Sequence, residues 1–257
     1  MRRTIMAGNW KMNASKESVN KLILGILSGM SEVSSEVVVC APFPYLSQVE
    51  ALITHSQVKL GAQNLNANPA GAFTGEVSAN MIKDFGARHV IVGHSERRSL
   101  YGETSSLVAE KVKAALDNDL TPLLCVGESL EQREAGETET VVAEQINAVI
   151  ELVGIGAFRN IIIAYEPVWA IGTGKTASPE QAQAVHLFIR SLLGESNESI
   201  AQGTPILYGG SMNAGNANEL ISCADIDGGL IGGAALKAED FLRSEEHTSE
   251  LQSHLNL

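Results

Sequence analysis

The chain is poor in cysteine and aromatic residues. Its 257 residues include three cysteines, and aromatic residues make up 5% of the total. Cys40, Cys125 and Cys223 are odd in number and far apart, so we expect free thiols in a reducing, cytoplasmic compartment rather than disulfides. No group of His, Cys and Asp residues has the spacing of metal ligands, so neither a metal nor another cofactor is expected.

Positive charge is also scarce. Eighteen Lys and Arg residues face 30 Asp and Glu residues, which gives a net charge of −12 and argues against nucleic acid or an anionic membrane as a partner. No apolar run approaches the ~20 residues of a membrane span. The Arg2-Arg3 pair is not followed by the apolar segment of an export signal. An anionic substrate would therefore need a locally positive site, built from a Lys and helix N-termini.

Short apolar runs alternate with helical patterns along the chain. The sequence predicts strands near Thr4–Gly8, Val37–Ala41, Val58–Gly61, His89–Val92, Pro122–Val126, Ile161–Tyr165, Pro205–Tyr208 and Gly229–Ile231. It predicts helices near 16–30, 45–54, 79–85, 104–118, 138–152, 179–193 and 214–221.

This alternation predicts an α/β protein with a parallel sheet and right-handed crossovers. Eight strands in about 250 residues is the number in a single closed (β/α)8 TIM barrel. An open, doubly wound sheet is the alternative, but it usually has a Gly-rich turn after its first strand, and this chain has Gly8-Asn9-Trp10-Lys11 there. No Pro- or Ser-rich linker divides the chain, so we expect one domain.

Polar residues follow several of the predicted strands, where a barrel places its catalytic groups. Glu166 ends a buried, β-branched run and is fixed by Pro167, and the segment after it is apolar and then rich in small residues. This is the pattern of a general base with a hinged lid that excludes water. The alternative is a strand-end carboxylate that pairs with a basic neighbour.

His94 follows another apolar strand and precedes Ser95, Glu96 and two arginines in what looks like a first helical turn. A helix N-terminus disfavours positive charge, so the imidazole would stay neutral and could polarise a carbonyl. The alternative is a histidine that only caps the core.

Lys11 is a candidate electrostatic clamp after the first strand. Gly209-Gly210-Ser211 and Gly232-Gly233 offer unobstructed backbone N–H groups after the last two strands, where barrels often bind phosphate. The run 172–176 resembles the end of a nucleotide-binding P-loop, but Trp169 stands where that motif needs its first Gly.

The segment 243–257 differs in origin from the rest of the chain in our interpretation. It can be back-translated to a common sequencing-adapter sequence, so we interpret it as a non-native tail without function that follows a barrel of residues 1–242. A polar, frayed terminal helix is the alternative.

Several motifs, in order along residues 2–242, resemble the triosephosphate isomerase family. They are Asn9-Trp-Lys11, Gly71-Ala-Phe-Thr-Gly-Glu76, Gly93-His-Ser-Glu-Arg-Arg98, Ala164-Tyr-Glu-Pro-Val-Trp-Ala-Ile-Gly-Thr-Gly-Lys175, Tyr208-Gly-Gly-Ser211 and Gly232-Gly-Ala234. The resemblance implies interconversion of dihydroxyacetone phosphate and D-glyceraldehyde 3-phosphate through a cis-enediolate, in glycolysis and gluconeogenesis.

The same resemblance implies a role for each matching residue. Glu166 would be the base, His94 would shuttle protons between the substrate oxygens, and Lys11 would offset negative charge with Asn9 as a supporting donor. Ser95 and Glu96 would support His94. The backbone N–H groups of Gly172, Ser211, Gly232 and Gly233 would hold the phosphate. The lid, residues 167–176, would close over the intermediate.

The resemblance also implies a homodimer, in which the loop 71–76, with Thr74 at its tip, inserts into the partner. A surface turn is the alternative for this loop. Three other functions stay open at this point: a barrel that binds phosphorylated metabolites without catalysis, a scaffold or adhesion protein, and another sugar-phosphate isomerase or lyase on the same fold.

Overall fold

A computed structural model describes residues 2–171 and 176–244 of the chain. Its strands are all parallel, and each pairs with its neighbours in sequence until β8 pairs with β1 and closes the barrel. The strands are β1 Ile5–Asn9, β2 Glu36–Ala41, β3 Lys59–Ala62, β4 His89–Val92, β5 Thr121–Val126, β6 Ile162–Tyr165, β7 Ile206–Tyr208 and β8 Gly228–Ile231. The prediction of a single (β/α)8 barrel is confirmed.

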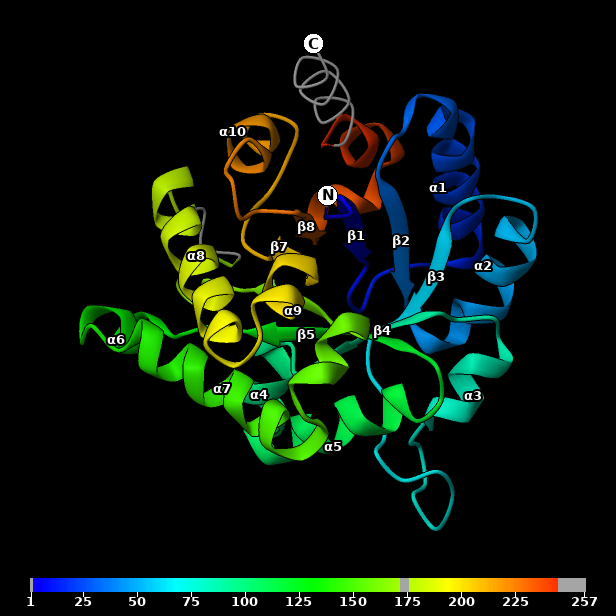
Figure 1. The fold of residues 1–257 in the computed structure, drawn as a ribbon. Helices are drawn as coiled ribbons and strands as arrows, with labels where there is room; N and C mark the ends of the chain where they lie inside the picture. Colours follow the sequence, from blue (N-terminus) through cyan, green and yellow to red (C-terminus); the bar gives the residue numbers. More distant parts are fainter. Residues whose placement is uncertain (1, 172–175, 245–257) are drawn as a thin grey trace.

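Helices surround the strands on the outside of the barrel (Figure 1). They are α1 Lys16–Gly29, α2 Leu46–Ile53, α3 Ala79–Asp84, α4 Ser95–Tyr101, α5 Ser105–Leu116, α6 Leu130–Glu134, α7 Thr138–Val153, α8 Pro179–Ser196, α9 Glu198–Gly203 and α10 Ala217–Ile221. Each predicted helix has a counterpart, whereas the short helices α6 and α9 were not predicted. Both are stabilised by N-cap residues, Ser129 and Asn197, rather than by a long apolar face.

Alternate residues of the strands face two different cores. The inner core fills the barrel with small and branched side chains, which include Ala7, Val38, Ile91, Leu123 and Ile162. The outer core lies between the strands and the surrounding helices. The barrel interior is therefore packed, and a ligand has space only at its ends.

The last described segment, residues 238–244, is helical and packs on α1. A Cβ placed on Gly25 or Gly29 of α1 would meet Ala238 or Leu242, respectively. The two glycines are four residues apart, so they leave a groove on one face of α1 that receives this helix. In the part of the chain that the structure describes, no helix is long and apolar enough to span a membrane.

Candidate active site

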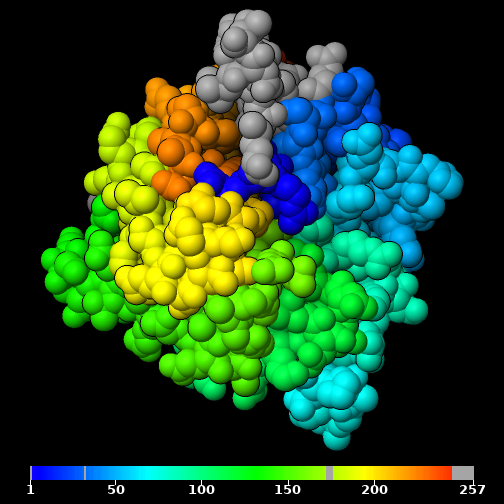
Figure 2. Space-filling model, in the orientation of Figure 1, coloured from blue at the N-terminus to red at the C-terminus, as the bar shows by residue number. Residues whose placement is uncertain are grey.

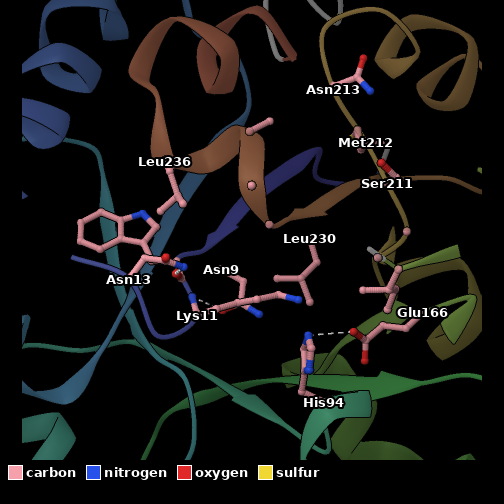
Figure 3. Close-up of a pocket in the computed structure, with 17 residues that line it drawn as sticks. Asn9, Lys11, Asn13, His94, Glu166, Ser211, Met212, Asn213, Leu230 and Leu236 are labelled. Carbon is pink, nitrogen blue, oxygen red and sulfur yellow. Dashed lines mark hydrogen bonds and ion pairs between the residues drawn. The ribbon is translucent and has the colours of Figure 1, made fainter. Parts of the chain in front are cut away.

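A pocket of about 360 Å³ opens at the carboxyl ends of the strands. It brings together seven residues that the sequence predicted for the site: Asn9, Lys11, His94, Glu166, Ser211, Gly232 and Gly233. Figure 3 shows the two catalytic candidates and Lys11 on one side of the pocket and Ser211 on the other. The predicted phosphate ligand Gly172 lies outside the described residues.

Glu166 is 2% exposed and makes contacts on both of its oxygens. Oε2 accepts a hydrogen bond from the Ser95 N–H at 2.9 Å, and Oε1 lies 2.9 Å from His94 Nε2 and 3.3 Å from Ser95 Oγ. A Cβ on Gly209 would come within 2.9 Å of Glu166 Cγ. The absence of a side chain at Gly209 is therefore what leaves room for the carboxylate.

His94 caps helix α4, as its sequence context predicted. The Glu96 N–H donates to His94 Nδ1 at 3.2 Å, so Nδ1 carries a lone pair and the ring proton is assigned to Nε2. That Nε2–H points at Glu166 Oε1 (Figure 3). The imidazole therefore donates a hydrogen bond to the Glu166 carboxylate.

The two groups shift each other's pKa. Burial raises the pKa of Glu166, but its attraction to and hydrogen bond with His94, together with the Ser95 N–H, more than offset burial and lower it. Burial lowers the pKa of His94, but the nearby Glu166 carboxylate more than offsets this and raises it. The raised pKa of His94 therefore depends on where Glu166 lies.

Lys11 is held in a strained backbone conformation. Its φ is 51°, a region that residues other than Gly rarely occupy. Asn9 Oδ1 accepts from the Lys11 N–H at 3.0 Å, and Gln63 Nε2 donates to the Lys11 carbonyl at 2.9 Å. The ammonium lies 2.5 Å from Glu96 Oε1, beside His94.

The glycine turns after β7 and β8 also line the pocket. A Cβ on Gly210 would come within 2.2 Å of the Tyr208 hydroxyl, and one on Gly232 within 3.6 Å of Lys11 Cε. The Gly232 turn is therefore adjacent to the Lys11 stem, and Gly233 begins a 3-10 helix. Bare backbone N–H groups beside an ammonium suit an anion in a protein whose net charge is −12.

Glu128 was not predicted as a residue of the site. This carboxylate is fully buried and accepts hydrogen bonds from the Tyr165 hydroxyl at 3.1 Å, Trp169 Nε1 at 2.9 Å and Arg133 at 3.2 Å. It thereby joins the loop after β5 to the residues on both sides of Glu166. A lone Glu after a strand carries no signal of this role, because its partners are 37 and 41 residues away.

Leu230, an apolar residue of β8 with no predicted role, also lines the pocket, as does Ile171 of the predicted lid. In the described residues, no cluster of three or more His, Cys, Asp and Glu has the geometry to hold a metal ion.

A groove of about 530 Å³ lies beside the pocket and shares Asn9, Lys11 and His94 with it. Its rim carries exposed apolar side chains, with Met12 98% exposed and Leu100 73% exposed. Thr74 does not line the groove of its own chain. It lies on an exposed loop that projects beyond α3 in Figure 1 and forms the cyan protrusion in Figure 2.

Comparison with known proteins gives a consistent result. A family model described as "Triosephosphate isomerase" matches residues 4–246. Triosephosphate isomerase from Ruthia magnifica subsp. Calyptogena magnifica is 68% identical over 243 residues, which cover 95% of this chain and 98% of the relative. The protein of the same name from Thiobacillus denitrificans is 55% identical over 242 residues, which cover 94% of this chain and 97% of the relative.

Proposed function

The chain belongs to the triosephosphate isomerase family, and on that premise we propose how its residues carry out the reaction. The enzyme interconverts dihydroxyacetone phosphate and D-glyceraldehyde 3-phosphate, an aldose–ketose isomerisation of glycolysis and gluconeogenesis. The reaction moves a proton between two adjacent carbons and passes through a cis-enediolate. The residues must therefore supply a base that takes a proton from carbon, an acid that protonates oxygen, and positive charge that offsets the charge of the enediolate.

Glu166 is the base. In the structure its oxygens are occupied by Ser95 and His94, so it has to exchange these contacts for the substrate C–H. It takes the proton from the carbon beside the carbonyl and returns it to the former carbonyl carbon. The lowered pKa of Glu166 keeps the carboxylate ionised and ready at neutral pH.

His94 is the acid for the substrate oxygens. Once Glu166 moves to the substrate, the Nε2–H of His94 is free to donate to the carbonyl oxygen, and the ring then shuttles protons between the two oxygens. Loss of the carboxylate contact also removes the main influence that raises the pKa of His94, while burial still lowers it. The ring therefore acts as a neutral donor.

Lys11 offsets the negative charge of the enediolate, and Asn9 holds the Lys11 backbone. The N–H groups of Ser211, Gly232 and Gly233 bind the phosphate, together with Gly172 of the lid. Closure of the lid over the intermediate excludes water and suppresses loss of phosphate.

We propose that the enzyme is a homodimer. The exposed loop that carries Thr74 would enter the groove of a second copy, next to its Lys11 and His94. This would cover the exposed apolar residues at the groove rim, which a monomer would leave in water. We place the enzyme in the cytoplasm because Cys40, Cys125 and Cys223 are free thiols.

The observation that carries the proposal is the pairing of Glu166 and His94 in a pocket that also holds Lys11. The test is a coupled assay of glyceraldehyde 3-phosphate isomerisation with the parent and Glu166→Asp. Removing one methylene draws the carboxylate back by over 1 Å, so kcat should fall by about 100-fold or more. A folded parent without turnover that still binds a phosphorylated analogue would instead indicate a binding protein.

A further inference from the structure

The loop after β5 holds the backbone on both sides of Glu166. The Glu166 N–H donates to the Val126 carbonyl at 2.8 Å, and the Val168 N–H donates to the Glu128 carbonyl at 3.2 Å. Residues 126–128 therefore form a template against which the base and the first residues of the lid are placed.

Gly127, in the middle of this template, touches Glu166 closely. A Cβ on Gly127 would lie 1.8 Å from the Glu166 carbonyl oxygen and 2.7 Å from its carbonyl carbon. The backbone of residue 166 can lie there only because position 127 has no side chain. A small displacement of Gly127 must consequently displace the backbone that carries the catalytic carboxylate.

One side chain fixes the backbone of Gly127. Gln145, from the middle of α7, accepts from the Gly127 N–H with Oε1 at 2.8 Å and donates to the Gly127 carbonyl with Nε2 at 3.1 Å. Gly127 lies one residue beyond the end of β5. The Gln145 amide makes the two backbone hydrogen bonds that a neighbouring strand would otherwise make. Among the described residues, no other group hydrogen-bonds to either backbone group of Gly127.

The outer side of this contact is open. A pocket of about 270 Å³ is lined by Ser95, Gly127, Gln145 and Glu166, and by Gln132 of α6. Because water can enter this pocket, loss of the Gln145 amide would leave the polar groups of Gly127 solvated rather than force the site to collapse. The expected consequence is a loosely placed base in a folded protein.

We propose that Gln145 is a positioning residue for the isomerase reaction, which acts through Gly127 on Glu166. This role rests on the proposed function of Glu166 as the base. Gln145 does not line the 360 Å³ pocket, so its effect should fall on the chemical step and not on substrate binding.

The test is the steady-state kinetics of Gln145→Met, which retains the length of the side chain and removes both hydrogen bonds. We expect kcat to fall at least tenfold while KM changes less than twofold. A non-reacting phosphate such as glycerol 3-phosphate should bind with unchanged affinity, because the phosphate turns are untouched. Gln145→Glu provides a second variant, since it can still accept from the Gly127 N–H but, when ionised, cannot donate to the Gly127 carbonyl. Its kcat relative to that of the parent at the same pH should recover as pH falls and the new carboxyl is protonated.

Gln132→Met is the matched control. Gln132 lines the same outer pocket, but within the described part of the chain its side chain hydrogen-bonds only to the Ser129 N–H at the start of its own helix. This variant should lose stability with kcat within twofold of the parent. Folded Gln145→Met with parental kcat would overturn the proposal. So would a Gln145→Glu variant whose kcat is the same fraction of the parental kcat at every pH. An inactive parent would instead contradict the proposed function itself, which separates the two failures.

Discussion

At the scale of single residues, the site depends on the hydrogen bond that His94 Nε2–H donates to the Glu166 carboxylate. The sequence could indicate that both residues end strands and that His94 begins a helix, because these are local patterns. It could not indicate that Glu166 rests on the Ser95 N–H, since that contact joins residues 71 positions apart. The pocket-lining role of Leu230 was equally hidden, because an apolar residue in a barrel strand looks like ordinary core.

The pair makes a prediction about pH. Substituting His94→Ala removes the attraction and the hydrogen bond that do most to lower the pKa of Glu166, and leaves burial opposed by the Ser95 N–H, so the pKa of the carboxyl should rise. In the parent, the lowered pKa contributes stability that is present above the pKa of the unfolded chain and is lost as pH falls through the folded value. In the variant, this contribution should be smaller.

A ¹³C NMR titration of the Glu166 carboxyl, assigned by its loss in Glu166→Gln, measures this shift directly. His55→Ala is the control, because His55 lies on the surface after α2. An unchanged or lower pKa of Glu166 in His94→Ala would show that His94 does not hold the carboxylate in its ionised form.

At the scale of elements, strands and long helices were predictable because their apolar periodicity is strong. The short helices α6 and α9 were missed because capping residues define them, and the same residues occur in turns. In the loops, single residues were predictable but the contacts that support them were not. Their site residues could be named from motifs, but the framework of Glu128 and Gln145 that supports them is assembled only when β5, β6 and α7 come together.

The loop with Thr74 at its tip makes the element-scale prediction. The groove proposed to receive it contains two cations, Lys11 and Arg97. Thr74→Arg should oppose insertion mainly through its size, because Glu96 in the same groove already pairs with Lys11. We expect a monomer at micromolar concentration and a large loss of kcat, because Lys11 and His94 would lose the segment that packs beside them.

Analytical ultracentrifugation and the coupled assay, run at the same protein concentrations, test this. Asn147→Arg adds the same charge on the exposed face of α7 and should change neither result. A fully active Thr74→Arg monomer would show that the loop is only a surface turn.

At the scale of the whole molecule, the fold solves an electrostatic problem. A protein with a net charge of −12 repels a phosphorylated substrate at long range. The barrel gathers the two glycine turns and Lys11 at one end, so that backbone N–H groups and one ammonium create a local positive field. The closing of the sheet, with β8 beside β1, is what brings the Gly232 turn next to Lys11.

We also propose that segment 243–257 is foreign to the barrel, and this leads to a stability prediction. Phe241 and Leu242 are buried, with Phe241 against the position of Gly8 and Leu242 in the groove at Gly29. A continuation with apolar residues on the same helical face should bury more of α1. At ~25 cal/mol per Å², about 100 Å² of new apolar burial would add about 2.5 kcal/mol. For a chain of this size, that corresponds to a melting temperature higher by roughly 5 to 10 °C.

The measurement is calorimetry on three proteins that share residues 1–242. One has the present segment, one has an amphipathic helix whose apolar face continues that of Phe241 and Leu242, and one has the same helix with its apolar residues moved to the solvent face. Only the second should melt at the higher temperature, and kcat should agree within twofold because the active site lies at the strand ends. Equal melting temperatures for the second and third proteins would mean that burial beyond Leu242 adds nothing to the stability of the barrel.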